Sequence, residues 1–503
     1  MFMACLRMPP GARGRPTQAQ TRRALRPVAA SGNRHRPRLG ERRGTAEPVL
    51  RFPATETRRH CMIRRLLLSL LFLVLAGPAL ADDPESAPAK PDQSWAIHLQ
   101  STVVWQGHPS FTSPYRGPNS MDPAARGDET FDLTLYAGLR LGPRTEIWIN
   151  PEVDQGFGLS NTLGAAAFPS GEAYKVGKSD PYLRLQRLFV RHTIDLGGPA
   201  QKIEADQNQL GGSQAADRIV LTAGKFSVGD VFDTNKYAHD PRGDFLNWAI
   251  IDTGTFDYAA DAWGYSAGAS AEWYAGRWTL RGGVFDLSIV PNSTRLDPKF
   301  AQFQTIAEIE RRFGPEDREG KLKLTGFITR GRMGRFDDAV ALAAATSQPA
   351  DVALVRHYGS RAGLGASLEE PLSDDLGLFV RAGWAQGDKE PYEFSDIDRT
   401  VAAGLSFNGK RWGRPDDAFA VGGVVNGISK AHQAYLDAGG LGILVGDGRL
   451  PHPGAEAAFE TWYSAAATKR VKVSADYQFI DHPAYNRDRG PVSVFGLRLH
   501  LQN

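Results

Sequence analysis

A regular alternation of apolar and polar residues runs through most of this chain. Near the C-terminus, the segment VKVSADYQF (471–479) has Val471, Tyr477 and Phe479 at one set of alternate positions and polar residues at the other. A period of two is typical of a β-strand with one apolar and one polar face. Sixteen such segments occur between residues 95 and 502, and no segment has a long helical period. The chain is therefore predicted to be all-β.

The predicted strands lie at 95–105, 131–141, 145–154, 183–194, 219–226, 262–274, 277–287, 305–313, 321–330, 360–369, 376–385, 400–408, 418–427, 457–467, 471–480 and 492–502. Their connections alternate between short ones, such as 142–144, 275–276 and 468–470, and long ones. The long connections are 106–130, 155–182, 227–261, 288–304, 331–359 and 428–456.

This alternation of lengths is typical of a transmembrane antiparallel up-and-down β-barrel of about 16 strands, with short periplasmic turns and long outer loops. An even number of strands puts both termini on the side of the short turns. The connection 195–218 is an exception, because it is long where a short turn is expected. Either two edge strands are misplaced there, or the turn carries an insertion.

A soluble β-sandwich would show the same alternation, but sandwich domains are usually about 100 residues long, and this pattern is uninterrupted over about four times that length. Aromatic residues at strand ends also favour a barrel in a membrane, since they form girdles at the headgroups. Trp273-Tyr274 and Trp278 flank one short turn, and Trp384 and Trp462-Tyr463 also lie at strand ends. Tyr477 and Phe479 are then expected to face lipid, and the polar positions between them the lumen.

The first 94 residues are predicted to lie outside the barrel. Residues 62–81, MIRRLLLSLLFLVLAGPALA, have the basic start, apolar run and small-residue cleavage site of a secretory signal peptide. Residues 1–61, which hold 14 Arg and 3 Glu, are interpreted as translation from an early start codon, the alternative being a genuine basic arm. Residues 82–94 are a short periplasmic spacer, and 95–503 are the barrel domain.

Removing the leader changes the charge of the chain. Residues 82–503 keep 43 of the 59 basic and 53 of the 56 acidic side chains, a net charge of −10, and contain neither of the two cysteines. Nucleic acid, which requires a concentrated basic surface, is therefore excluded as the expected partner. Without disulfides, the exported protein must be stabilised by sheet closure or a large core.

Motifs of catalysis are weak in this chain. Gly264-Tyr265-Ser266-Ala267-Gly268 fits the G-x-S-x-G pattern of a nucleophile elbow, but it lies in an alternating strand with no helix after it. The glycines of 439–448 lack the spacing of a phosphate-binding loop. The eleven histidines show no metal-ligand spacing. No enzymatic activity, cofactor or metal is predicted.

Two groups of residues could bind a ligand inside the barrel. The first lies on the inner faces of the third and fourth predicted strands, where carboxylates on one strand oppose guanidinium groups on the next, with a β-bulge expected at Gln186-Arg187. Carboxylates, Arg forks and aromatic rings together suit the hydroxyls and C–H faces of sugars, although the same charges could only stiffen the wall. The residues are Glu146, Trp148, Asn150, Glu152, Asp154, Arg184, Gln186, Phe189 and Arg191.

The second group lies on the connection 227–261, which is long enough to fold into the lumen and narrow it. An ordinary exposed outer loop is the alternative. Its candidate residues are Asp230, Asp233, Asn235, Lys236, Asp240, Arg242, Asp244 and Trp248.

Three long segments, NPEVDQGFGLSNTLGAAAFPSGEAYKVG (150–177), PYLRLQRLFVRHTIDLGG (181–198) and residues 224–274, resemble the OprB-type carbohydrate-selective porins of Gram-negative outer membranes. The resemblance covers 95–503 and implies a 16-stranded barrel in the outer membrane that passes small, glucose-like sugars passively. It also implies contact with lipid and lipopolysaccharide and delivery by the outer-membrane assembly machinery, and it leaves a homotrimer open. The rival functions are an outer-membrane barrel enzyme and a soluble or surface sugar-binding β-protein.

Overall fold

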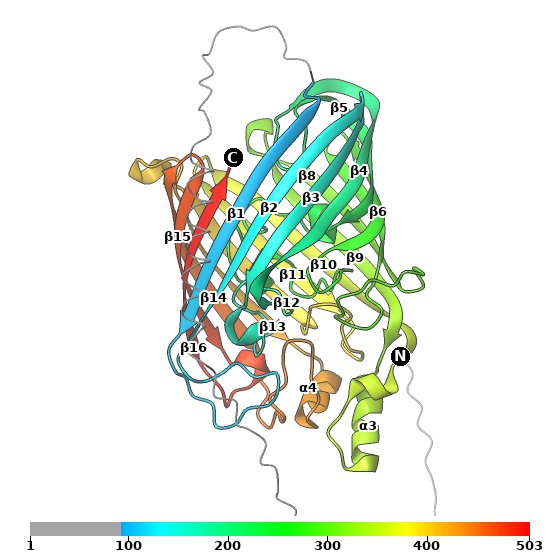
Figure 1. The fold of residues 1–503 in the computed structure, drawn as a ribbon, viewed down its shortest axis with the longest axis vertical. Helices are drawn as coiled ribbons and strands as arrows, with labels where there is room; N and C mark the ends of the chain where they lie inside the picture. The colour runs from blue at the N-terminus through cyan, green and yellow to red at the C-terminus, as the bar shows by residue number, and fades with distance from the viewer. Residues whose placement is uncertain (1–91) are drawn as a thin grey trace, which may run out of the picture. The chain divides into compact units, whose positions relative to one another are not determined.

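The computed structural model describes residues 92–503, which contain a closed barrel of sixteen strands (Figure 1). Every strand pairs antiparallel with its neighbours in chain order, and β1 closes the barrel against β16. The predicted fold class is confirmed, and each predicted strand is present. The predicted signal peptide and the extension before it lie outside the described residues.

The strands are β1 (Trp95–His108), β2 (Arg126–Gly142), β3 (Thr145–Gly156), β4 (Lys178–Ile203), β5 (Gly212–Phe226), β6 (Ser266–Ala275), β7 (Trp278–Asp286), β8 (Phe303–Phe313), β9 (Gly320–Met333), β10 (His357–Ser373), β11 (Leu376–Ala385), β12 (Arg399–Asn408), β13 (Ala418–Gly427), β14 (Glu456–Thr468), β15 (Val471–Asp481) and β16 (Val492–Gln502). The α-helices are α2 (Trp248–Ile251), α3 (Phe336–Thr346) and α4 (Lys430–Asp437), and the short 3₁₀ helices are η1 (Leu159–Asn161), η2 (Val228–Asp230), η3 (Glu316–Arg318), η4 (Val352–Val355), η5 (Gly409–Trp412) and η6 (Pro483–Tyr485).

Short and long connections lie on opposite rims. The short turns, among them 143–144, 276–277 and 469–470, share a rim with both ends of the barrel, and the long connections, which carry α3 and α4, share the other (Figure 1). The irregular connection 195–218 is mostly strand: β4 and β5 extend to an eight-residue turn at 204–211. Register shifts around Gly197 interrupt the alternation there, which is why the sequence pattern read as a loop.

The outer surface of the strands is apolar. Leu183, Leu364 and Phe495 are examples of the many large apolar side chains that the strands expose. Trp273, Trp278 and Trp384 are exposed at strand ends, as a girdle requires, but Trp462 is buried and packs against Phe245 inside the barrel. The girdle prediction was wrong for Trp462, because neighbouring residues on a strand face opposite sides and Tyr463 takes the outer one. No helix in residues 92–503 is long and apolar enough to cross a membrane.

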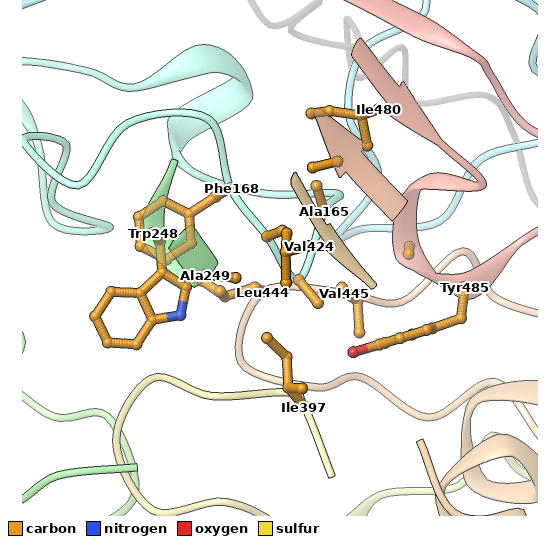
Figure 2. Close-up of a cluster of buried hydrophobic side chains, with 14 of the residues drawn as sticks. Ala165, Phe168, Trp248, Ala249, Ile397, Val424, Leu444, Val445, Ile480 and Tyr485 are labelled. Atoms are coloured by element: carbon orange, nitrogen blue, oxygen red, sulfur yellow. The ribbon is translucent and has the colours of Figure 1, made fainter. Parts of the chain in front are cut away.

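An apolar core fills part of the interior of the barrel, so the lumen is not open across its whole width. Figure 2 shows this core, in which loop residues such as Trp248, Phe168 and Leu444 meet Val424 of β13 and Ile480 of β15. The rings of Phe168 and Trp248 are stacked, with centroids 5.6 Å apart. These loops fill one side of the barrel, and two cavities lie towards the wall that contains β1, β2, β4, β5 and β6.

Candidate functional site

Strands β3 and β4 form the wall that carries most of the predicted ligand-binding residues. Glu152 of β3 lies directly opposite Arg184 of β4, as the alternation predicted. Between Asn150 and Pro151 the register shifts, so that Gln186 is the extra residue of a bulge. The predicted bulge is therefore present.

The bulge turns two consecutive residues of β4 towards the lumen. Gln186 is buried and donates from Nε2 to Glu152 Oε1 at 3.1 Å, while Arg187 binds the loop residue Asp230. A regular strand would point one of the two at lipid. Sequence reasoning found the bulge but did not select Arg187, although a guanidinium at a bulge next to lumen residues was a usable signal.

Arg242 joins the long loop to the wall. Its guanidinium lies 3.5 Å from Asp132 of β2, 3.4 Å from Glu152 of β3 and 3.2 Å from Glu172 of the preceding long loop. Burial lowers the pKa of Arg242, but these carboxylates outweigh it and hold the pKa well above its ordinary value. Burial raises the pKa of Glu172, and Arg242 offsets only part of this shift.

A second bridge between loop and wall is made by Arg187 and Asp230. Arg187 Nε and Nη2 donate to the two oxygens of Asp230 at 2.8 and 2.6 Å, which is a bidentate pair. Burial raises the pKa of Asp230, but the charge and hydrogen bonds of Arg187 more than compensate, so the pKa lies below its ordinary value. The pair therefore stays ionised at neutral pH.

Arg184 does not bind the carboxylate opposite it. Its Nη2 lies 3.0 Å from Asp261 of the loop, and its guanidinium stacks on the ring of Trp263, 3.3 Å from the centroid. Lys225 of β5 also reaches Asp261, at 3.3 Å. Arg184 thus stacks on the ring of Trp263, and the cation that pairs with Glu152 is Arg242 of the loop.

Residues 227–265, between β5 and β6, lie inside the barrel and are held there by inward-facing wall residues. Arg381 of β11 donates from Nη1 to the carbonyls of Ala238 and Ile250 and from Nη2 to that of Asp233, at 2.7 to 3.1 Å. On the far wall, Glu460 of β14 accepts the backbone N–H groups of Leu246 and Asn247. Charged side chains of the wall therefore replace the water that would otherwise solvate this loop.

The loop and the β2–β4 wall enclose a cavity of about 300 Å³. Aromatic side chains line one part of it, and charged or amide side chains line the rest. The aromatic members are Tyr136, Tyr174, Trp248, Tyr258, Trp263 and Tyr265, and the polar members include Gln100, Glu172, Arg187, Gln207, Asn208, Asp230, His239, Asp240, Arg242 and Asp252.

A second cavity of about 580 Å³ lies closer to the rim of the short turns. Its lining includes Arg191 of β4, Gln214 and Arg218 of β5 and Tyr274 of β6. Tyr274 therefore faces the lumen, not the headgroups, because it alternates with the exposed Trp273. The two cavities are adjacent, since Asp230 and His239 of loop 227–265 line both.

The remaining predicted residues lie in several environments. Trp148 and Phe189 are buried in an apolar cluster, Asn150 donates to Asn208, Asp154 accepts from Gln186, and Glu146 accepts from Trp148 Nε1. On the loop, Asp233 holds Thr253, Asn235 reaches Ser367, Asp244 accepts backbone N–H groups of its own loop, and Lys236 is exposed. Of all the ligand-binding residues predicted from the sequence, six line one or both of the two cavities: Phe189, Arg191, Asp230, Asp240, Arg242 and Trp248.

Ser266, the candidate nucleophile, begins strand β6 and is buried. Its hydroxyl donates to the carbonyl of Asp286 at 2.6 Å. A nucleophile elbow requires an exposed hydroxyl on a strand-to-helix turn. The motif is therefore ordinary barrel wall.

The family model for the carbohydrate-selective porins of the OprB family matches residues 118–502. Comparison with curated proteins finds no match. Among solved structures, the high-pH structure of Pseudomonas putida OprB aligns with a TM-score of 0.60 at 15% identity, over 82% of this chain and 94% of that one.

The low-pH structure of Pseudomonas putida OprB aligns with a TM-score of 0.44 at 11% identity, over 82% and 93% of the two chains. The outer membrane channel DcaP of Acinetobacter baumannii aligns with a TM-score of 0.45 at 9% identity, over 81% and 97%. The match at 0.60 shows a shared fold, and the family match covers most of the barrel. The chain belongs to the OprB family of carbohydrate-selective porins, which are channels of the outer membrane and not enzymes.

Proposed function

We propose that small, glucose-like mono- or oligosaccharides diffuse passively through the cavity of about 300 Å³ between loop 227–265 and the β2–β4 wall. The observation that carries the proposal is the division of its lining into aromatic rings and charged hydrogen-bonding groups. A sugar presents the same two surfaces, namely C–H faces that pack on rings and hydroxyls that donate and accept. The volume falls at the lower end of small-molecule sites, which span about 300–1,000 Å³.

Each part of the lining has its own role in this proposal. Trp263 and Tyr265 offer ring faces, and Arg184 and Arg187 keep those rings in place by stacking on them. Arg187 and Arg242 donate to sugar hydroxyls, and the carboxylate of Asp230 accepts hydrogen bonds from other hydroxyls of the sugar. These cations and carboxylates are already paired with one another, so a sugar competes for their hydrogen bonds and binds weakly enough to leave.

The wall and loop residues predicted from the sequence divide into two groups in this proposal. Arg191, Asp230, Asp240, Arg242 and Trp248 line the passage and contact the sugar. Glu146, Trp148, Asn150, Glu152, Asp154, Arg184 and Gln186 hold the wall or the loop in position. Phe189, at the edge of the second cavity, offers a further apolar surface.

Block of single-channel current by sugar in planar bilayers tests the proposal. The wild-type channel should show concentration-dependent block by glucose or a short glucose oligomer. Trp263→Ala should weaken the block up to about 10-fold, since contacts with an aromatic face are worth about 0.5–1.5 kcal/mol. Trp273→Ala, which removes an indole exposed on the outside, is the matched control and should leave the block unchanged. Absence of block in the wild type would refute the proposal.

Export and assembly form a further part of the proposal. Residues 62–81 would direct export and be removed, and the assembly machinery would insert the barrel among lipid and lipopolysaccharide. N-terminal sequencing of the purified protein tests the first point, and a start upstream of Asp82 would contradict it. A homotrimer stays a prediction that the mass of the protein in detergent can test.

A further inference from the structure

The turn between β4 and β5 folds into the barrel from the rim opposite the long loops. Residues 204–211 connect β4 to β5 on the rim that also carries the turns 143–144 and 276–277. In this turn Asp206 and Gln209 exchange both backbone hydrogen bonds, at 3.0 and 3.1 Å, so Gln207 and Asn208 form a two-residue tip. Asn208 has a φ of 56°, which asparagine accepts more readily than most residues.

The lumen wall holds this tip at several points. Asn150 Nδ2 of β3 donates to Asn208 Oδ1 at 2.8 Å, and Arg191 Nη1 of β4 donates to the Asn208 carbonyl at 2.7 Å. Leu210 is fully buried in the apolar cluster that contains Trp148 and Phe189. A surface turn would have no reason to bury a leucine or to occupy two inward-facing polar side chains of the wall.

The tip lies where the two cavities meet. The cavity of about 300 Å³ and the cavity of about 580 Å³ share four lining residues, which are Gln207 and Asn208 from the turn and Asp230 and His239 from loop 227–265. Two segments that enter from opposite rims therefore face each other across the passage. Gln207 Nε2 is buried and has no hydrogen-bond partner among residues 92–503.

We propose that the β4–β5 turn is a specificity-determining element of the channel, and that the Gln207 amide donates to a hydroxyl of the passing sugar opposite Asp230 and His239. This inference rests on the proposed function, because it assigns one face of the same sugar path. An unpartnered buried amide is costly, and a sugar hydroxyl that binds it relieves the cost. A sugar hydroxyl can accept from the Gln207 amide and also donate to a neighbouring group, whereas a simple ion or an apolar solute of equal size cannot do both.

Sugar block separates this inference from the proposed function. Gln207→Ala should weaken block by glucose about 5- to 10-fold, and Gln201→Ala, an exposed amide on the same hairpin, should leave block unchanged. If the wild type is blocked and Trp263→Ala loses block but Gln207→Ala does not, the proposed function stands and this inference fails. If the wild type is not blocked, the proposed function itself fails.

The position of the turn has an independent test. Residues 82–503 contain no cysteine, so Gln207→Cys introduces a single thiol into the barrel domain. A small cationic methanethiosulfonate reagent should reduce single-channel conductance in one step, because it narrows the junction of the cavities. Lys202→Cys, an exposed position on β4, should be modified without a change in conductance. Equal responses of the two variants would overturn the inference.

Discussion

Individual charged side chains fix the loop that lines the cavity of about 300 Å³. Arg242 alone contacts carboxylates from β2, β3 and the 157–177 loop. Each of those carboxylates is almost fully buried, and a buried charge that loses its partner is far more costly than the pair itself is stabilising. The cluster therefore holds the loop in place, because removing any one member would leave buried charges without a partner.

Arg242→Ala is expected to destabilise the barrel by roughly 3–5 kcal/mol, the usual cost of removing one member of a buried ion pair. Urea unfolding in detergent micelles measures this change. Arg242→Lys keeps the charge and should recover part of the loss, although it lacks the fork that reaches three carboxylates. A stability equal to that of the wild type in Arg242→Ala would show that the carboxylates are solvated without it.

His239 should make the channel's ion preference depend on pH. Burial lowers the pKa of His239, but the carboxylate of Asp252, 3.4 Å from Nδ1, outweighs this effect. The charge of Arg381 lowers the pKa and that of Asp233 raises it, and the pKa lies above its ordinary value. The folded protein thus favours the charged form. The stability it adds is complete below the unfolded pKa of about 6.5 and is lost as pH rises through the folded pKa.

As pH rises through that value, a positive charge disappears where the two cavities meet, and the preference for cations should increase. Reversal potentials in a salt gradient between pH 5.5 and 9 measure this shift. His239→Gln should show no such step. A step of the same size in the variant would assign the titration to another group.

Among the elements, loop 227–265 depends on the wall and not on its own secondary structure. It contains only a four-residue helix and one 3₁₀ turn, and its internal backbone hydrogen bonds join residues that are close in sequence, such as Asp244 N–H to the Asp240 carbonyl. Wall side chains from β8, β10, β11, β14 and β16 bind further backbone groups of the loop and fix it to the barrel. An inward loop of this kind is stable only where the strands carry inward-facing polar residues level with the loop's backbone groups.

Arg381→Leu should release this loop. Three loop carbonyls would each lose a hydrogen bond to a charged donor, worth about 1.5–3 kcal/mol. We expect higher single-channel conductance and weaker sugar block, measured in planar bilayers. Arg399→Leu, which removes an exposed arginine at the start of β12, is the matched control. Unchanged conductance in Arg381→Leu would mean that the other anchors are sufficient.

The molecule as a whole has two different rims, and its orientation in the membrane follows from them. Both ends of the barrel lie on the rim of short turns, which faces the periplasm in outer-membrane barrels. Helix α3 and the residues after it extend from the other rim (Figure 1). In outer-membrane barrels the longer loops face the cell exterior, so the rim of long connections is expected outside.

A protease site inserted at 347–349, an exposed segment after α3, should be cut on intact cells. The same site at 469–470, in the turn between β14 and β15, should be cut only after the outer membrane is opened. Immunoblotting of cell-surface digests measures both. The opposite pattern would reverse the orientation of the barrel.

The strands could be predicted from the sequence because their information is local. Alternation in 471–479 and in the other strands depends only on which face of a pleated strand meets lipid. The opposition of Glu152 and Arg184 and the bulge at Gln186 followed from the same local pattern. It failed around Gly197, where bulges hide the extended hairpin. The error at Trp462 has a different cause, because the girdle prediction includes it together with Tyr463, although neighbouring residues on a strand face opposite sides.

The passage itself depends on contacts that no local pattern contains. Arg184 lies opposite Glu152 in the ladder but binds Asp261, and Glu152 binds Arg242, which lies 90 residues further along the chain. Gln207 and Asp230 line the same two cavities because segments from opposite rims enter one barrel. The positions of the strands are specified by the alternating polarity of neighbouring residues, which is local. Ion pairs and cavity shape depend instead on which groups barrel closure brings within a few ångströms of one another.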